Sequence, residues 1–163
     1  MSLDRRTFLK VTGIGGALAV AGAPFASALT SPDITHGSRA TPHVALTFHG
    51  AGSHTMGKEL LSIFTERKAQ VSIFAVGTWL AANPEFAQQI IADGHDLGNH
   101  TMNHLQMKTL NAAKAHSEIA GCAAELKKLI GNHGKWFRPS GTQYSSAIIR
   151  KAATSLGYNK CIS

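Results

Sequence analysis

The chain has 163 residues, a formal net charge of +7 and 44% hydrophobic residues, a composition that suits a folded domain. Its Lys and Arg residues are scattered and form no long basic run. This pattern argues against a nucleic-acid partner and favours an ordinary solvated surface, with weak attraction to an anionic cell wall as an alternative.

The first 28 residues have the layout of an export signal. An arginine pair followed by Phe-Leu-Lys lies within residues 4–10, a mildly apolar run covers 11–23, and Ala-Ser-Ala at 26–28 has the form of a cleavage site. The apolar run is too short and too rich in glycine to span a bilayer of about 30 Å well. We therefore expect a twin-arginine signal peptide over 1–28, only transient membrane contact during export, and a periplasmic, cell-wall-associated or extracellular protein.

Cleavage after Ala28 would leave 135 residues (163 − 28), enough for one domain with its own core. The segment takes away three basic residues and one acidic residue, so the net charge would fall from +7 to +5. The twin-arginine route carries proteins that have already folded. Such a route would suit a domain that acquires a metal before export.

The rest of the sequence alternates between apolar runs and amphipathic segments. Residues 29–42 are polar and predict a linker, and 43–163 predict one domain. Strands are predicted at 43–48, 71–76, 95–98, 135–138 and 158–162, and helices at 58–67, 84–93, 111–130 and from Ser145 or Ser146 to 156. Asn83, before Pro84, predicts a helix N-cap. The alternation predicts an α/β fold with about five parallel strands and covering helices.

The two cysteines allow two interpretations. Cys122 falls in a predicted helix and Cys161 in a predicted strand. An exported chain permits a disulfide, but two small buried thiols fit these positions at least as well.

The segment from Gly98 to His104 carries the most informative pattern of the chain. His100 and His104 are four residues apart and directly follow a predicted strand. If the backbone is helical there, both rings lie on one face and can offer two neutral nitrogens to one metal. A zinc ion bound in this way sits about 2.0–2.1 Å from each nitrogen. The spacing predicts a divalent metal site, whereas ordinary polar caps without a metal are the alternative.

Polar residues follow three of the predicted strands. His49 directly follows the first strand, His100 and His104 follow the third, and Arg138 ends the fourth. Because the carboxyl ends of parallel strands meet at one edge of a sheet, we expect these side chains to converge there.

Three segments at these positions resemble the first three motifs of the polysaccharide deacetylases, also called carbohydrate esterase family four or the nodulation-type deacetylase domain. The segments are 46–50 (Leu-Thr-Phe-His-Gly), 98–104 (Gly-Asn-His-Thr-Met-Asn-His) and 137–141 (Phe-Arg-Pro-Ser-Gly), and the resemblance covers roughly 43–163. It implies a distorted (β/α) barrel and metal-dependent removal of N- or O-acetyl groups from a polysaccharide such as chitin, peptidoglycan or xylan. The acetylated polysaccharide is then the expected partner, and zinc the expected cofactor.

The resemblance also assigns roles to single residues. His100 and His104 match the two histidine metal ligands of the family. His49 stands where the family has an aspartate general base, and an imidazole can also accept a proton. Gly50 stands where the family has a third metal ligand and has no side chain to offer. His49 itself or His54 would then be the third ligand, and the sequence leaves this choice open.

The third motif departs from the family pattern as well. Arg138 matches the arginine that pairs with and orients the base aspartate of the family. Beside a histidine this pairing is not attractive, because a guanidinium and a protonated imidazole repel each other. Ser140 replaces an aromatic residue whose backbone N–H serves the oxyanion hole, and Tyr144 cannot be assumed to take its place. A backbone donor near Gly141 is the remaining candidate for that role.

Family members continue beyond a fifth strand to an Asp-rich motif and a late histidine that acts as general acid. This sequence stops at Ser163, so we expect a truncated domain whose barrel is not closed. Because several catalytic groups differ, the alternative to a deacetylase is an inactive relative that binds glycan in the same groove.

His95 and Asp96 are candidates for orienting the metal ligands or simply begin a strand. Trp79 and Trp136 either line a sugar groove or pack over the fold.

Overall fold

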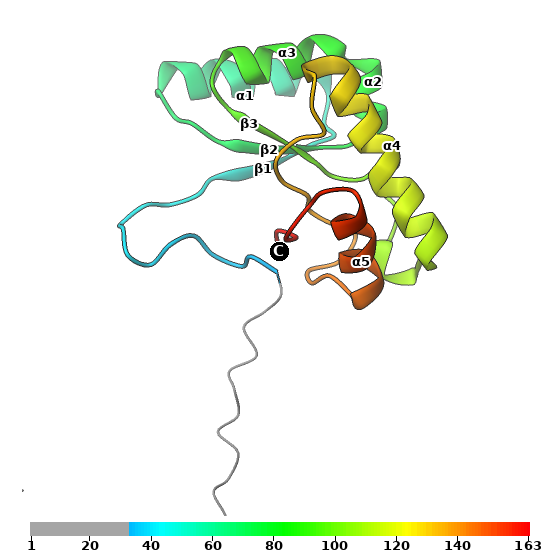
Figure 1. Ribbon diagram of the computed structural model, residues 1–163. Helices are drawn as coiled ribbons and strands as arrows, with labels where there is room; N and C mark the ends of the chain where they lie inside the picture. Colours follow the sequence, from blue (N-terminus) through cyan, green and yellow to red (C-terminus); the bar gives the residue numbers. More distant parts are fainter. Residues whose placement is uncertain (1–32) are drawn as a thin grey trace, which may run out of the picture. The chain divides into compact units, whose positions relative to one another are not determined.

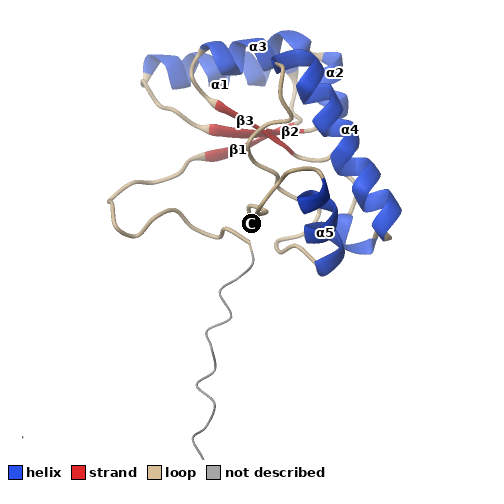
Figure 2. Ribbon diagram, viewed as in Figure 1, coloured by secondary structure: helices blue, strands red, loops and turns tan. Residues whose placement is uncertain are grey.

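The structure, a computed structural model, describes residues 33–163, so the predicted signal peptide lies outside the described residues. At its centre is a parallel sheet of β1 (Thr47–Gly50), β2 (Ser72–Ala75) and β3 (Asp96–Asn99), in the order β1-β2-β3 (Figures 1 and 2). Because all three strands run in one direction, their carboxyl ends lie at one edge of the sheet. The predicted parallel α/β arrangement is confirmed.

Two further segments extend the sheet by single parallel bridges. Phe137 pairs with Asn99 on one side and with Cys161 on the other, and Ile162 pairs with Ile34 from the segment predicted as a linker. The fourth and fifth strands are therefore much shorter than the predicted ranges 135–138 and 158–162. Pro139 has no backbone N–H to donate, so the fourth segment cannot continue a ladder beyond that point.

Helices cover the sheet and flank its end (Figure 2). Their bounds are α1 (His54–Glu66), α2 (Gly77–Ala82), α3 (Pro84–Ala92), α4 (Ala112–Ile130) and α5 (Ala147–Ser155), with a 3-10 turn at η2 (Met107–Thr109). Figure 1 shows α1 and α3 on the same face of the sheet, and α5 packs against α4. Between residues 33 and 163, no helix combines the length and apolarity needed to cross a membrane.

Several predicted helix ends are confirmed by their capping contacts. The Asn111 side chain accepts a backbone N–H from the first turn of α4, and Gly131, with φ +80°, caps the other end of the helix. Ser146 rather than Ser145 caps α5 in the same way. Asn83 lies at the start of α3 as predicted, but its side chain does not cap the helix. Its Nδ2 donates to the Trp79 carbonyl instead, because α2, which the sequence did not predict, directly precedes α3.

The first strand begins later than predicted and is less buried. The prediction placed it at 43–48, whereas β1 covers Thr47–Gly50, and Val44 and Leu46 are exposed. The reason is that β1 pairs with β2 on one side only and forms an edge of the described sheet. An apolar run at an edge has no second neighbour to cover it.

Two clusters of buried side chains form the core. One lies between the sheet and helices α1, α3 and α4 and includes Phe64, Ile73 and Cys122; the other lies around α4 and α5 and includes Phe137, Tyr158 and Cys161. Both cysteines are free and buried, so they are thiols and do not form the disulfide. Burial raises the pKa of the Cys122 thiol to about 12, which keeps it protonated and unreactive.

Candidate metal and catalytic site

The carboxyl edge of the sheet brings together the polar residues that the sequence placed after separate strands. The His49 ring at the end of β1 lies 4.3 Å from the His100 ring, which follows β3. Arg138 follows Phe137, and its carbonyl oxygen lies 2.9 Å from Nδ1 of His100. The expected convergence at one edge is therefore present.

His100 is the most constrained side chain of this group, with a relative exposure of 1%. Its backbone N–H donates to the Ala75 carbonyl, and its Nδ1 bonds to the Arg138 carbonyl. Since a carbonyl oxygen only accepts, Nδ1 must carry the ring proton. Nε2 is buried and has no hydrogen-bond partner. Burial lowers the pKa of His100 to about 4, so near neutral pH the ring is neutral and Nε2 keeps its lone pair.

The loop that carries His104 is not helical, so the helical condition for a shared histidine face is not met. Thr101 and His104 have φ values of +69° and +56°, outside the helical region. The two rings nevertheless meet, with centroids 5.0 Å apart and planes at 66°. Two imidazoles that share a tetrahedral zinc have ring centroids about 5 Å apart, given the zinc–nitrogen bond length. The separation of the two rings is therefore compatible with two ligands of one cation.

A third ligand is not in place. The His49 ring is stacked on His100 with planes at 25°, so its in-plane lone pair does not converge with that of His100 on one point. Among residues 33–163, no group of three or more His, Cys, Asp or Glu side chains is arranged to hold a metal ion. At Gly50, a Cβ atom would lie 3.0 Å from Cβ of Ala75, so the position is crowded as well as lacking a ligand.

His54, the other candidate third ligand, lies apart from this cluster. Its Nε2 is 2.9 Å from the Glu85 carboxylate, and its ring contacts the edge of Phe86. Both partners belong to α3. His54 therefore joins α1 to α3, and this contact argues against it as the third ligand, one of the two alternatives that the sequence left open.

Arg138 faces the histidines from the fourth segment. Its Nη1 donates to the Thr47 hydroxyl at 3.2 Å, and its guanidinium lies over the Phe74 ring at 4.3 Å. Burial of the ring lowers the pKa of His49, and the nearby guanidinium lowers it further. Partial burial and Arg138 together favour the neutral form of His49, the state in which an imidazole can accept a proton.

The segment after Arg138 is anchored rather than free. The buried Ser140 hydroxyl bonds to the Thr101 hydroxyl at 2.9 Å and donates to the Leu105 carbonyl at 2.5 Å. Gly141 has φ +63°, and a Cβ there would lie 2.5 Å from the Gln106 side chain, so the turn needs glycine. Tyr144 is exposed. Ser140 therefore joins the third motif to the second, a role that the sequence did not reveal.

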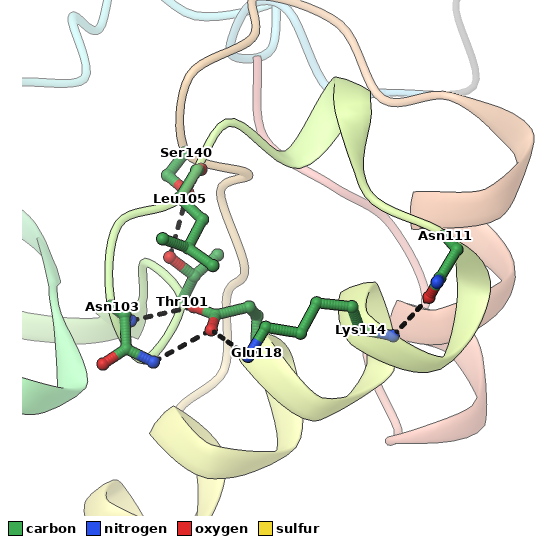
Figure 3. Close-up of polar contacts among 7 residues, drawn as sticks. All are labelled: Thr101, Asn103, Leu105, Asn111, Lys114, Glu118 and Ser140. Carbon is green, nitrogen blue, oxygen red and sulfur yellow. Dashed lines mark hydrogen bonds and ion pairs between the residues drawn. The ribbon is translucent and has the colours of Figure 1, made fainter.

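Two other buried residues that the sequence did not single out hold the histidine loop. Asn99 donates from Nδ2 to the Ile119 carbonyl and to the Tyr158 hydroxyl, and its Oδ1 accepts from the Thr101 N–H. Glu118 on α4 accepts two hydrogen bonds from Asn103 (Figure 3). For Glu118, the only available signal was the presence of a polar residue on the apolar side of a helix.

His95 and Asp96 do not orient the metal ligands. They lie at the amino end of β3, opposite to the end that His100 follows. The buried His95 ring packs edge-on against Phe64. Of the two interpretations, the start of a strand is the correct one.

The tryptophans differ in their surroundings. Trp79 donates from Nε1 to the Gly52 carbonyl at 2.8 Å and packs against Phe86, so it fixes the loop after β1. Trp136 lines an open cleft together with Phe74 and Arg138. This cleft lies on the face of the sheet opposite to Ile73 and the helices that pack on it.

Comparisons with known proteins agree with this geometry. The family model described as "Polysaccharide deacetylase" matches residues 36–161. A peptidoglycan-N-acetylglucosamine deacetylase from Bacillus cereus is 30% identical over 115 residues, which cover 71% of this chain and 53% of that protein.

Solved structures give the same result. A mutant of a CE4 family pseudoenzyme with restored enzymatic activity has a TM-score of 0.74 at 25% identity, and the match covers 82% of this chain and 48% of that one. A family 4 carbohydrate esterase from Streptomyces lividans, in complex with acetate, has a TM-score of 0.66 at 26% identity, covering 71% and 59%.

The chain spans about half the length of these relatives. The likeness confirms the predicted partial (β/α) barrel, and the part of it formed by residues 33–163 is not closed. From the matched family model, the three motifs and the fold together, the chain belongs to the polysaccharide deacetylase family.

Proposed function

We propose that this chain carries the metal-binding part of a zinc-dependent hydrolase site that removes acetyl groups from a polysaccharide. The observation that supports this proposal best is the His100 ring. It is buried and neutral, its Nδ1 is fixed by the Arg138 carbonyl, and its Nε2 has no partner. Metal-binding histidines have this arrangement, in which a hydrogen bond from one nitrogen orients the other toward the metal.

His100 and His104 would hold the cation between them. A bound zinc ion would supply the Lewis acidity that polarises an acetyl carbonyl and the activation of water near neutral pH. The protein holds His100 through the end of β2 and through the third motif, because Ala75 and Arg138 accept its two hydrogen bonds. His104 is exposed, so its ring can reach a cation at the open edge of the sheet.

His49 would act as the general base. Its stacked ring is poorly placed as a ligand, but it lies beside the histidine pair and its lowered pKa keeps it neutral. The same shift makes it a weaker base than an unperturbed imidazole, because a lower pKa means a lower affinity for the proton. Arg138 would contribute by holding His49 neutral and by anchoring His100 through its carbonyl oxygen.

The substrate we propose is an acetylated cell-wall or related polysaccharide. The Bacillus cereus relative is named for deacetylation of N-acetylglucosamine in peptidoglycan, which supports an N-acetyl sugar. Export by the twin-arginine pathway would bring the domain to such a substrate. Replacing Arg5 and Arg6 by Lys in a chain fused to a secreted reporter should stop export, whereas undiminished export would count against the predicted signal.

The test of the proposed function is zinc titration of the full chain, followed by measurement of acetate release from N-acetylated chitooligosaccharides, peptidoglycan and acetylxylan. We expect one zinc ion per chain and acetate release that is lost on chelation and restored by zinc. A chain that neither binds zinc nor releases acetate would contradict the proposal.

A second candidate is a glycan-binding member of the family without catalytic activity. The absence of a ready third ligand in the part of the chain described and the crowding at Gly50 favour it. A pseudoenzyme is also among the structural neighbours. Glycan binding that persists in the presence of a chelator, without acetate release from any of these substrates, would support this candidate over the first.

A further inference from the structure

Glu118 has an unusual environment for a carboxylate. It lies on α4 with a relative exposure of 1%, although glutamate is almost never fully buried unless its oxygens are paired. The loop that carries the metal-binding histidines supplies the partners. The Asn103 backbone N–H donates to Oε2 at 2.8 Å, and the Asn103 side-chain amide donates to Oε1 at 2.9 Å (Figure 3). Lys114, one turn earlier on α4, lies 3.6 Å from the same carboxylate.

The backbone next to Asn103 is strained. Thr101 and His104 are two of the three non-glycine residues with positive φ among residues 33–163. Such a conformation is unfavourable for a residue that has a side chain, and it persists only where surrounding contacts hold it. Asn103 directly precedes His104, so the Glu118 carboxylate is bonded immediately beside the strained residue that presents the second imidazole.

The rest of the loop has separate supports. Backbone N–H groups of Gly77 and Thr78 donate to the Thr101 and Met102 carbonyls, and the Met102 N–H donates to the Glu118 carbonyl. His100 is held by Ala75 and Arg138. Loss of the Glu118 carboxylate would therefore release Asn103 and His104 and leave His100 in place.

We infer that Glu118 is a positioning residue for His104. It fixes Asn103 so that the His104 ring stays within reach of the cation held by His100, and so converts two separate imidazoles into one preformed site. This inference rests on the proposed function. It concerns a residue that touches neither cation nor substrate and acts through Asn103.

The experiment compares zinc affinity of the full chain with that of Glu118→Leu, Glu118→Gln and Glu125→Leu. Leu has no acceptor oxygen, so zinc affinity should fall about 10–100-fold, the usual effect of losing a group that orients a ligand. Gln can still pair with Asn103 if the asparagine amide flips, so its affinity should stay within about threefold of the parent. Glu125, on the same helix, bonds to Lys128 and to no residue of the loop, so Glu125→Leu is the matched control.

Hydrogen exchange in the metal-free proteins separates positioning from general loss of stability. In Glu118→Leu, exchange of the Asn103 amide should rise more than about tenfold. Exchange of the His100 amide should not change, because His100 is held by Ala75 and Arg138 and local opening near Asn103 need not involve it. Asn103→Ala is the second variant, in case Glu118→Leu does not fold. Asn103 is exposed, so this change should leave the fold intact and lower zinc affinity about threefold to tenfold, since it removes one of the two hydrogen bonds.

The outcomes are distinct. A parent chain that does not bind zinc overturns the proposed function. A parent that binds zinc, together with a folded Glu118→Leu of equal affinity and unchanged Asn103 exchange, overturns the role of Glu118 alone. Equal losses of affinity in Glu118→Leu and Glu125→Leu would also overturn it.

Discussion

The carboxyl ends of β3 and β1 contribute to the same proposed site. They differ in how many of their polar side chains have hydrogen-bond partners and in the ligands they can offer. After β3, nearly every polar group has a partner: Asn99, Thr101 and Asn103 are all hydrogen-bonded within the protein. At the end of β1, His49 is exposed and held by a ring stack, and Gly50 offers no side chain. In the site that we propose, the second motif is preorganised to hold a cation, whereas the first leaves its coordination incomplete.

The largest effect on zinc affinity should come from removing the His100 side chain. His100→Ala deletes one of two proposed ligands together with its fixed orientation, so zinc affinity should fall more than about 1,000-fold. His54→Ala is the control, because His54 bonds to Glu85 on α3. Calorimetric titration with zinc measures both. Strong zinc binding by His100→Ala would place the metal elsewhere.

Replacement of His49 should separate binding from chemistry. In His49→Ala, zinc affinity should stay within about threefold of the parent, while acetate release should fall about 10²–10⁴-fold, the usual contribution of a general base. The measurement is zinc titration beside the rate of acetate release. A loss of zinc affinity as large as that of His100→Ala would instead make His49 the third ligand.

The buried His100 ring should make the metal-free protein sensitive to acid. Its pKa is about 4 in the folded protein against 6.5 in the unfolded chain, so between these values the unfolded chain binds more protons. Stability from this ring is complete above about pH 6.5 and declines as the pH falls toward 4, by up to about 3 kcal/mol. Urea unfolding at pH 7.5, 6, 5 and 4.5 measures this. The decline should be smaller in His100→Asn, and an equal decline in both proteins would assign it to other groups.

The smallest effect should come from adding a carboxylate at position 50, where the first motif lacks a metal ligand. In Gly50→Asp, the new Cβ crowds Ala75, which should lower the free energy of unfolding by about 1–3 kcal/mol. Ala75→Gly in addition removes the closest atom and should recover part of this loss. If the carboxylate completes the site, the double variant should bind zinc about tenfold more tightly than the parent with Ala75→Gly alone. No gain in affinity would show that position 50 cannot reach the cation.

The sequence predicted those parts of the fold that local chemistry decides. Asn111 and Ser146 cap helices through their own side chains, and apolar runs marked β2 and the core face of α4. The offset of β1 was not predictable in this way, because burial of Val44 and Leu46 depends on a neighbouring strand rather than on their own side chains. The three isolated bridges likewise depend on how distant segments meet.

For the site, the sequence predicted which residues meet but not how. The positions of His49, His100 and Arg138 after parallel strands were enough to predict their convergence. From the sequence, a helical turn from His100 to His104 was only a condition for a shared face, and contacts from Glu118 and Ser140 hold the loop in another conformation. No spacing pattern marks those two residues, because each contacts a loop residue that is distant in the sequence and is brought close only by the fold.

The central claim is that His100 and His104 share one cation. Zinc K-edge X-ray absorption of the zinc-loaded full chain tests it most directly. We predict scattering from at least two imidazole rings, with zinc–nitrogen distances of about 2.0–2.1 Å, reduced to one ring in His104→Ala. A zinc environment without imidazole scattering, or one that His104→Ala leaves unchanged, would contradict the claim.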